Sequence, residues 1–211
     1  VIVKGDGIFL YDNDGKKFFD AMSGLWCVNI GYGRQELAKV AAKQMEELPF
    51  YNTFFGTTHP PVVNLSKAIA EVAPAHMNHI FFSSSGSEAN DTNIRLVRHY
   101  WASYGKPAKR IIISRLNAYH GSSLGSASLG GMKSMHSQGG LPVPNIIHIN
   151  QPYWYAEGGN MNHEDFGVMR ARELESKIIE VGPDNVAAFI AEPIQGAGGV
   201  IIPPQSYWPE I

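Results

Sequence analysis

Short apolar runs alternate with longer amphipathic segments through most of the chain, and this alternation limits the possible folds more than any other feature. Such runs are typical of strands that are buried on both faces of a sheet. Strands that alternate with helices favour parallel pairing, with helices on both sides. We therefore predict an α/β fold with a mainly parallel sheet and flanking helices. The predicted strands are Ile80–Phe82, Ile111–Ile113, Ile146–Ile149 and Val186–Ala191.

The longer segments carry helix signals at their ends. Apolar residues recur within them at helical spacing, and proline or glycine stands where a helix should start or stop. The predicted helices are Gln35–Leu48, Pro60 to Pro74, Gly86–Tyr104 and about Glu164–Val181, and Tyr207–Ile211 has the sequence of another helix's opening.

The first 20 residues predict a hairpin instead. The runs Ile8–Tyr11 and Lys17–Phe19 flank Asp12–Gly15. This turn segment ends in Asp-Gly, which is a strong signal for a tight turn between two strands.

Composition excludes several classes of protein. The 211 residues are 44% hydrophobic with a net charge of −2, which argues against a disordered chain and against binding to nucleic acid or an acidic membrane surface. No apolar run is long enough to cross a bilayer, and the start lacks a signal-peptide pattern. The lone Cys27 cannot form an internal disulfide, so we expect a cytoplasmic protein. Because the chain begins at Val1 rather than Met, we expect its native start to lie upstream.

The segment Ser85-Gly86-Ser87-Glu88 has the properties of a phosphate site. It stands between a predicted strand and a predicted helix, and Ser85 and Glu88 have the spacing of a capping box. The first amides of a helix have no internal partners and face the positive end of the helix dipole. With Gly86 allowing close approach and two hydroxyl groups beside it, the segment can hold an anion. By itself, however, such a segment is more often a plain helix cap without a ligand.

Three further segments identify a family. Asn117-Ala118-Tyr119-His120-Gly121 follows one predicted strand, Ala191-Glu192-Pro193-Ile194-Gln195-Gly196 ends another, and Leu25-Trp26 follows the hairpin. In this order, and together with the phosphate segment, they resemble the class III aminotransferases, which depend on pyridoxal phosphate (PLP). The resemblance implies a truncated PLP-dependent transferase fold of type I. Residues 1–45 would belong to its small domain and residues 46–211 to the first part of its large domain.

The resemblance also implies roles for individual residues. Ser85, Gly86 and Ser87 match the loop that holds the cofactor phosphate, and Tyr119 matches the aromatic residue that stacks on the pyridine ring. His120 matches a histidine beside the cofactor, although a purely structural role fits it as well. Glu192 matches a glutamate at the active site that can pair with a mobile arginine from downstream sequence, so we interpret it as a gating or pocket residue.

The family needs two groups that we expect downstream of this chain, namely the Schiff-base lysine and the acid that keeps the pyridine nitrogen protonated. We therefore assign no catalytic residue here, and we expect the fragment to be inactive alone. Lys133 is the nearest substitute for the lysine, but it follows Gly130-Gly131 rather than a strand.

An aromatic run suggests the substrate. Trp26 and the run Phe50–Phe55 most resemble those of omega-amine:pyruvate transaminases, so we predict that Trp26, Phe54 and Tyr119 contact a primary amine or omega-amino acid whose amino group passes to pyruvate or a similar keto acid. Other class III specificities, for beta-alanine, ornithine or diamino acids, remain open. By analogy with the family, we expect a homodimer with shared active sites.

Two readings from other classes have weaker support. Gly121-Ser122-Ser123-Leu124-Gly125 matches the G-x-S-x-G pattern of serine hydrolases, with Ser123 as nucleophile. No strand directly precedes it, however, and Gly130-Gly131 disfavours the long helix that should follow. His76 and His79 have no evident third ligand for a metal.

Overall fold

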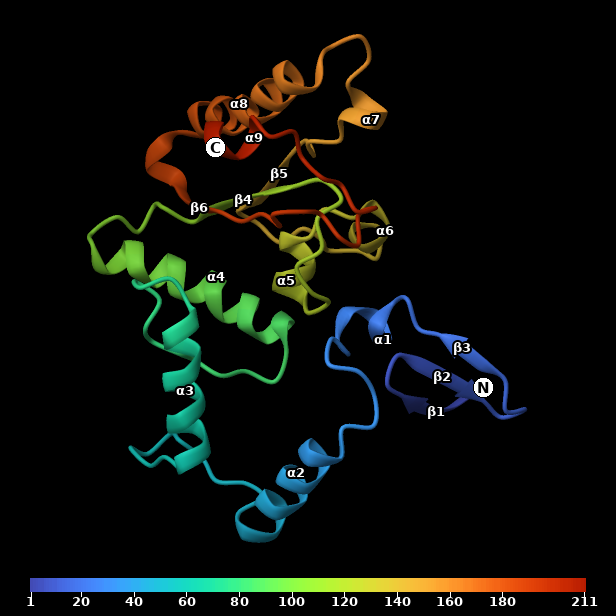
Figure 1. Ribbon diagram of the computed structural model, residues 1–211. Helices are drawn as coiled ribbons and strands as arrows, with labels where there is room; N and C mark the ends of the chain where they lie inside the picture. The colour runs from blue at the N-terminus through green and yellow to red at the C-terminus, as the bar shows by residue number, and fades with distance from the viewer. The chain divides into compact units, whose positions relative to one another are not determined.

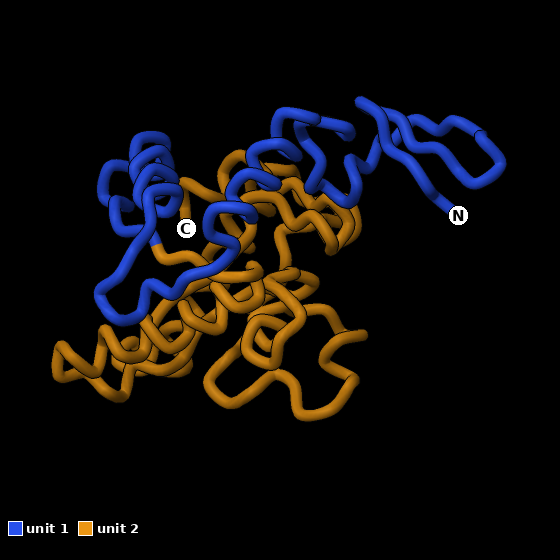
Figure 2. The backbone as a smooth tube through the Cα atoms, turned by 90° about the horizontal axis from the view of Figure 1, so that it is seen from below, with its two compact units in different colours: residues 1–80 blue, residues 81–211 orange.

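The computed structural model describes residues 1–211, and the chain divides into two compact units. The first unit is Val1–Ile80 and the second is Phe81–Ile211; Figure 2 shows them in different colours. Each unit is described by itself.

The first unit contains a small antiparallel sheet. Strands β2 (Phe9–Asp12) and β3 (Lys17–Phe19) form the predicted hairpin, with Leu10 opposite Phe18. The Asp12 carboxylate closes the turn by accepting hydrogen bonds from the amides of Asp14 at 3.0 Å and Lys16 at 2.8 Å. A further strand that was not predicted, β1 (Ile2–Asp6), pairs antiparallel with β2.

The helices of the first unit agree with the predictions. Helix α2 (Gln35–Glu47) stops before Pro49, and α3 (Pro60–Val72) starts with two prolines, whose missing amide hydrogens cost nothing in a first turn. A short helix, α1 (Ser23–Trp26), was not predicted.

The second unit contains the predicted parallel sheet. Strand β4 (Ile111–Arg115) lies between β5 (Ile146–Ile149) and β6 (Val186–Phe189), and both pairs are parallel. The prediction of a strand at Ile80–Phe82 is wrong. A strand needs a neighbour for its backbone groups, and these residues pair with neither edge of the sheet; Phe81 is 72% exposed.

Two long helices flank this sheet, as predicted. They are α4 (Gly86–Ser103) and α8 (His163–Val181). The remaining helices are short, and the predicted helix opening at the end of the chain is one of them. They are α5 (Leu124–Leu129), α6 (Lys133–His136), α7 (Trp154–Glu157), the 3-10 turn η1 (Pro183–Asn185) and α9 (Tyr207–Glu210).

The core of the second unit has two layers, one on each face of the sheet. Ile112 faces α4 and α5 and packs with Ile94 and Leu129, whereas Ile113 faces α8 and packs with Leu174. Figure 1 shows the same arrangement, with α8 on one side of the strands and α4 and α5 on the other. Each buried isoleucine contributes roughly 1.5–3 kcal/mol to folding, so the alternation along β4 fixes which helix covers which face.

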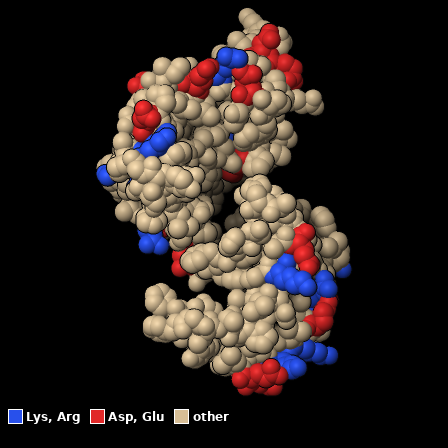
Figure 3. Space-filling view, turned by 90° about the vertical axis from the view of Figure 1, so that its left-hand side faces the viewer, with Lys and Arg blue, Asp and Glu red and all other residues tan.

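The face of the molecule shown in Figure 3 has no concentration of one charge. In Figure 3, acidic and basic side chains are interspersed on the face in view. None of the helices is both long and apolar enough to cross a membrane.

Candidate active site

The residues predicted to bind phosphate lie at the N-terminus of α4. Ser85 is the N-cap, and its hydroxyl oxygen accepts the Glu88 amide at 3.1 Å. The Glu88 carboxylate reaches back one residue further than a standard capping box, to the Ser84 amide at 2.8 Å. Because the amides of Gly86 and Ser87 come first in the helix, no intrahelical carbonyl is available to them. They therefore remain free for an anion.

Contacts with the loop after β4 hold this helix end in place. The Ser87 hydroxyl oxygen accepts the Ser122 amide at 3.0 Å, and the Asn90 side chain donates to the His120 carbonyl at 2.7 Å. The Asp91 carboxylate accepts the Ser126 amide at 2.7 Å, at the start of α5. Ser87 accepts only one bond, so its hydroxyl proton is available to a ligand.

These contacts lie beside an open pocket of about 320 Å³ on the second unit. Its lining joins the phosphate loop to the loop after β4, at the carboxyl end of the sheet where ligands of α/β folds bind. The lining residues are Gly86, Ser87, Asn90, Tyr119, His120 and Gly121. Four of the predicted cofactor residues thus meet at one pocket, while Asn90 and Gly121 were not predicted. Asn90 lies one helical turn after Gly86, and that spacing could have indicated it.

Glu192 is tied directly to this pocket. Its carboxylate accepts the Tyr119 amide at 2.9 Å and the Gly196 amide at 3.0 Å. Because Tyr119 lines the pocket and is 44% exposed, Glu192 fixes the backbone from which an exposed aromatic ring projects.

The His120 ring can form a further hydrogen bond at this pocket. Its Nε2 is buried and makes no hydrogen bond within the chain. Burial lowers the pKa of His120 below its ordinary value of 6.5; the nearby Glu192 charge opposes this shift, and Arg115 and His148 add to it. The ring is therefore neutral near pH 7, and one of its nitrogens can hydrogen-bond to a ligand.

The predicted substrate residues Trp26 and Phe54 belong to the first unit, and both are exposed. Trp26 has the left-handed φ of 64°, which is uncommon for residues other than glycine. Asp20 holds the turn that carries it, because its carboxylate accepts the Gly24 amide and the Tyr32 hydroxyl. The Tyr32 hydrogen bond in particular lowers the pKa of Asp20.

The structure does not support the alternative hypotheses of a serine hydrolase, a Schiff base at Lys133 or a metal site. Ser123 belongs to the capping box of α5, and its hydroxyl oxygen lies 2.8 Å from that of Ser126 rather than beside a histidine. Lys133 starts α6 and is exposed, and His76 and His79 belong to no group of three or more residues that could hold a metal.

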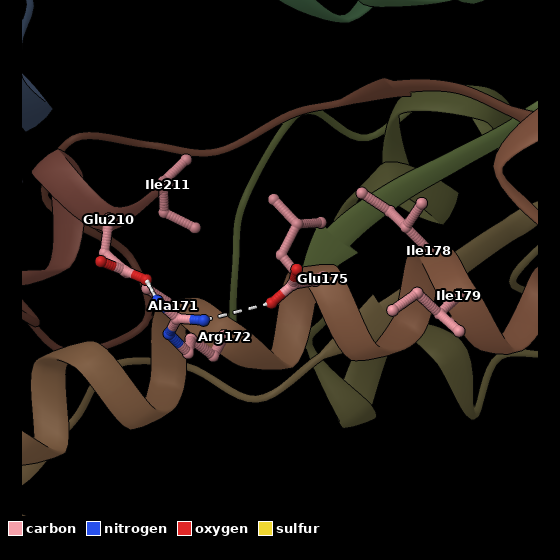
Figure 4. Close-up of a pocket in the computed structure, with 8 residues that line it drawn as sticks. Ala171, Arg172, Glu175, Ile178, Ile179, Glu210 and Ile211 are labelled. Carbon is pink, nitrogen blue, oxygen red and sulfur yellow. Dashed lines mark hydrogen bonds and ion pairs between the residues drawn. The ribbon is translucent and has the colours of Figure 1, made fainter.

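Another pocket, of about 470 Å³, lies where α8 meets the end of the chain (Figure 4). Arg172 lies at its edge and pairs with Glu175 and with Glu210. Ala171, Leu174, Ile178, Ile179 and Ile211 complete the lining. None of the predicted cofactor or substrate residues lines this pocket, so we do not regard it as the active site.

Comparison with known proteins identifies the family. The model of the class III aminotransferases matches residues 1–211, which is the whole chain. The chain belongs to the class III aminotransferases. The predicted resemblance and the predicted type I fold are thereby confirmed.

The relatives agree with this assignment. The chain is 63% identical to a putrescine–pyruvate aminotransferase of Pseudomonas aeruginosa over 211 residues, and 44% identical to a diaminobutyrate–2-oxoglutarate transaminase of Halomonas elongata over 214 residues. All of this chain matches, but only 46% of each relative is covered, so the chain spans about half the length of these relatives.

Solved structures show the same fold. The omega-transaminase of Pseudomonas jessenii in complex with PMP, the aminated form of PLP, superimposes with a TM-score of 0.96 at 43% identity. An (S)-enantioselective omega-transaminase from Thermomicrobium roseum gives the same two values. In both comparisons the match covers 100% of this chain and 47% of the other.

The pocket on the second unit fits the PLP of this family. A Cβ atom built on Gly86 would meet no atom within 4 Å, so there is space for a phosphate group against the start of α4. Ser85 and Ser87 offer hydroxyl protons, Tyr119 offers an exposed ring, and the His120 Nε2 lacks a partner.

Proposed function

We propose that the complete protein is a PLP-dependent transaminase that moves an amino group from a primary amine, including diamines such as putrescine, to pyruvate. The observation that carries this proposal is the 63% identity, along the whole chain, to a putrescine–pyruvate aminotransferase. A donor that is an omega-amino acid, or a keto acid similar to pyruvate, belongs to the same proposal.

The residues of the second unit would hold the cofactor at both ends. The amides of Gly86 and Ser87 and the hydroxyl groups of Ser85 and Ser87 would bind the phosphate, where a helix terminus contributes roughly 0.3–2 kcal/mol to anion binding. The Tyr119 ring would stack on the pyridine ring, which is worth about 0.5–1.5 kcal/mol beyond area burial. Bound PLP supplies the electron sink that makes amino-group transfer possible.

His120 and Glu192 would organise the remainder of the site. The neutral His120 ring would hydrogen-bond to the cofactor or to a water beside it, while Glu192 would keep Tyr119 in position. We assign proton transfer to neither of them, because the family resemblance places the proton-carrying lysine outside these 211 residues.

We also propose the wider arrangement that the family suggests. Residues 1–45 would belong to a small domain and residues 46–211 to the first part of the large domain. Trp26 and Phe54 would line the substrate pocket of a cytoplasmic homodimer. The exposed aromatic run Phe50–Phe55 supports this, since large apolar side chains in a loop are rarely left in water.

A donor panel tests the proposed specificity. The complete enzyme would be given pyruvate with putrescine, 1-phenylethylamine, beta-alanine, ornithine or 2,4-diaminobutyrate, and alanine formation would be measured. We expect putrescine to be used with a kcat/KM at least about tenfold higher than ornithine or diaminobutyrate, a difference of about 1.4 kcal/mol in transition-state binding. Activity confined to ornithine, or to diaminobutyrate with 2-oxoglutarate, would refute the assignment.

The variant Trp26→Ala tests, in the same assay, whether Trp26 lines the substrate pocket. We expect the order of the donors to change while PLP binding stays intact. Phe19→Ala is the control, because Phe19 is also an exposed aromatic residue of the first unit. Loss of the cofactor or of the dimer in Trp26→Ala would show that Trp26 is structural.

A further inference from the structure

Arg115 is a fully buried arginine without a carboxylate partner. It ends β4 with no exposed surface, and no acidic side chain lies within ion-pair distance of it. Arginine stays protonated in proteins, so this position holds a buried positive charge. Taking a charge out of water without an ion-pair partner costs free energy of folding. Stability alone therefore does not explain why an arginine stands here.

Two aromatic rings and one backbone carbonyl surround the guanidinium group. Its central carbon lies 5.3 Å from the centre of the Trp208 ring and 5.7 Å from that of the buried Tyr207 ring. Nη2 donates a hydrogen bond to the Glu192 carbonyl, whereas Nε and Nη1 have no partner in the chain. The rings restrict where the group can lie, and its only hydrogen bond is to Glu192.

The same glutamate holds the loop of the candidate active site. Its carboxylate accepts the Tyr119 amide at 2.9 Å and the Gly196 amide at 3.0 Å. A continuous series of contacts thus runs from Arg115 through the Glu192 backbone and side chain to Tyr119, which lines the pocket.

We propose that Arg115 is a positioning residue for the cofactor: it fixes the Glu192 peptide, so that the Glu192 carboxylate holds Tyr119 where its ring meets the pyridine ring. This inference rests on the proposed function, because it needs PLP in the pocket beside Tyr119. Arg115 itself touches neither cofactor nor substrate in this proposal.

The variant Arg115→Lys tests it in the holoenzyme. Lysine keeps the charge and most of the volume but lacks the planar fork that reaches Glu192 between two rings. We expect PLP to bind roughly tenfold more weakly, a change that corresponds to about 1.4 kcal/mol. We also expect the visible circular dichroism of the bound cofactor to fall by about half or more, since this signal reports the fixed environment of the ring.

Arg98→Lys is the matched control. Arg98 is a partly buried arginine of the second unit. Like Arg115, it donates to backbone carbonyls, namely those of Arg110 at 3.1 Å and Pro144 at 3.5 Å, but it does not line the pocket. We expect Arg98→Lys to affect thermal stability alone and to leave the affinity and the dichroism unchanged.

A double-mutant cycle separates positioning from general packing. If Arg115 acts through Glu192, then Arg115→Lys should weaken PLP binding by less than about twofold in a Glu192→Ala background, because coupled residues are not additive. The same tenfold loss in both backgrounds, or no loss in either, would overturn the proposal.

Two further outcomes are also informative. If Arg115→Lys does not fold, Trp208→Leu replaces it, since Trp208 is 37% exposed and its loss frees the guanidinium group without removing the charge. Unchanged affinity and dichroism in that variant would contradict the proposal. If the wild-type protein binds no PLP at all, the proposed function fails and this inference fails with it.

Discussion

At the scale of single residues, Gly86 is a glycine that the packing of the chain does not require. It is the first residue of α4, and an added Cβ would meet nothing within 4 Å. Gly131 is the opposite case, because a Cβ there would lie 2.1 Å from the Arg115 carbonyl oxygen. The fold therefore requires glycine at position 131. At position 86 the chain has space for a side chain, so a requirement for glycine there would come from a bound ligand.

The variant Gly86→Ala tests this difference through two quantities, the free energy of unfolding and the affinity for PLP. The free energy of unfolding should stay the same or rise by roughly 0.5–1 kcal/mol, since alanine is the better helix former. PLP affinity should fall by about tenfold or more, because the methyl group takes the place of the phosphate, at a cost of at least ~1.4 kcal/mol. Denaturant titration and a cofactor titration check the two values.

Asn162→Ala provides the reverse control. Asn162 caps α8 by accepting the Asp165 amide at 2.9 Å, and it does not line the pocket. Its loss should lower stability by about 0.5–2 kcal/mol and leave PLP affinity as it was. If Gly86→Ala binds PLP normally, the start of α4 is only a helix end.

At the scale of elements, two histidines hold the end of α5. The Gly130 carbonyl lies 2.8 Å from the Nε2 of His136 and 2.7 Å from the Nε2 of His148, so each ring donates to it. The next residue, Gly131, exchanges backbone hydrogen bonds with the loop after β4, donating to Ala118 and accepting from Asn117. The histidines thus support the loop that carries Tyr119.

Stability should fall as the pH drops below the ordinary histidine pKa of 6.5. Burial lowers the pKa of His148, and it also lowers the pKa of His120. Below pH 6.5 these histidines are protonated in the unfolded chain but still neutral in the folded chain. The free energy of unfolding therefore decreases as the pH falls toward the lowered pKa values. Denaturant titrations from about pH 8 to about pH 5 measure this slope.

Single replacements test whether His148 contributes to this slope. His148→Asn should flatten it while keeping an N–H that can donate to Gly130. His99→Asn should leave it unchanged, because His99 lies on the exposed side of α4. An equal slope in the wild type and in His148→Asn would show that His148 does not contribute.

At the scale of the whole molecule, the pocket of the second unit is lined by no side chain that could form a Schiff base with PLP. None of the lysines lines the pocket formed by Gly86, Tyr119 and His120, and Lys133 starts an exposed helix. We expect borohydride reduction of the holoenzyme to leave a pyridoxyl group on no lysine of residues 1–211. Peptide mapping by mass spectrometry checks this, and a stoichiometric adduct on Lys133 would contradict it.

The sequence by itself determined the longer helices, the three strands of the parallel sheet and the family. Periodicity and helix-end signals were enough for α2, α3, α4 and α8, because those signals act within a few residues of each other. Ser85 could be assigned to a helix cap for the same local reason. The motifs around Tyr119 and Glu192, taken together with the phosphate segment and Leu25-Trp26, were enough for the class III resemblance.

Only the tertiary structure decided which of these residues meet. Ile80–Phe82 has the sequence of a strand, but pairing depends on a neighbour that local sequence cannot specify. Arg115 follows an apolar run and could equally have pointed into solvent. It is buried because α9, more than 90 residues later in the chain, places Tyr207 and Trp208 over it. The Glu192–Tyr119 hydrogen bond likewise joins residues 73 positions apart, and such long-range contacts form only when the whole sheet brings its carboxyl ends together.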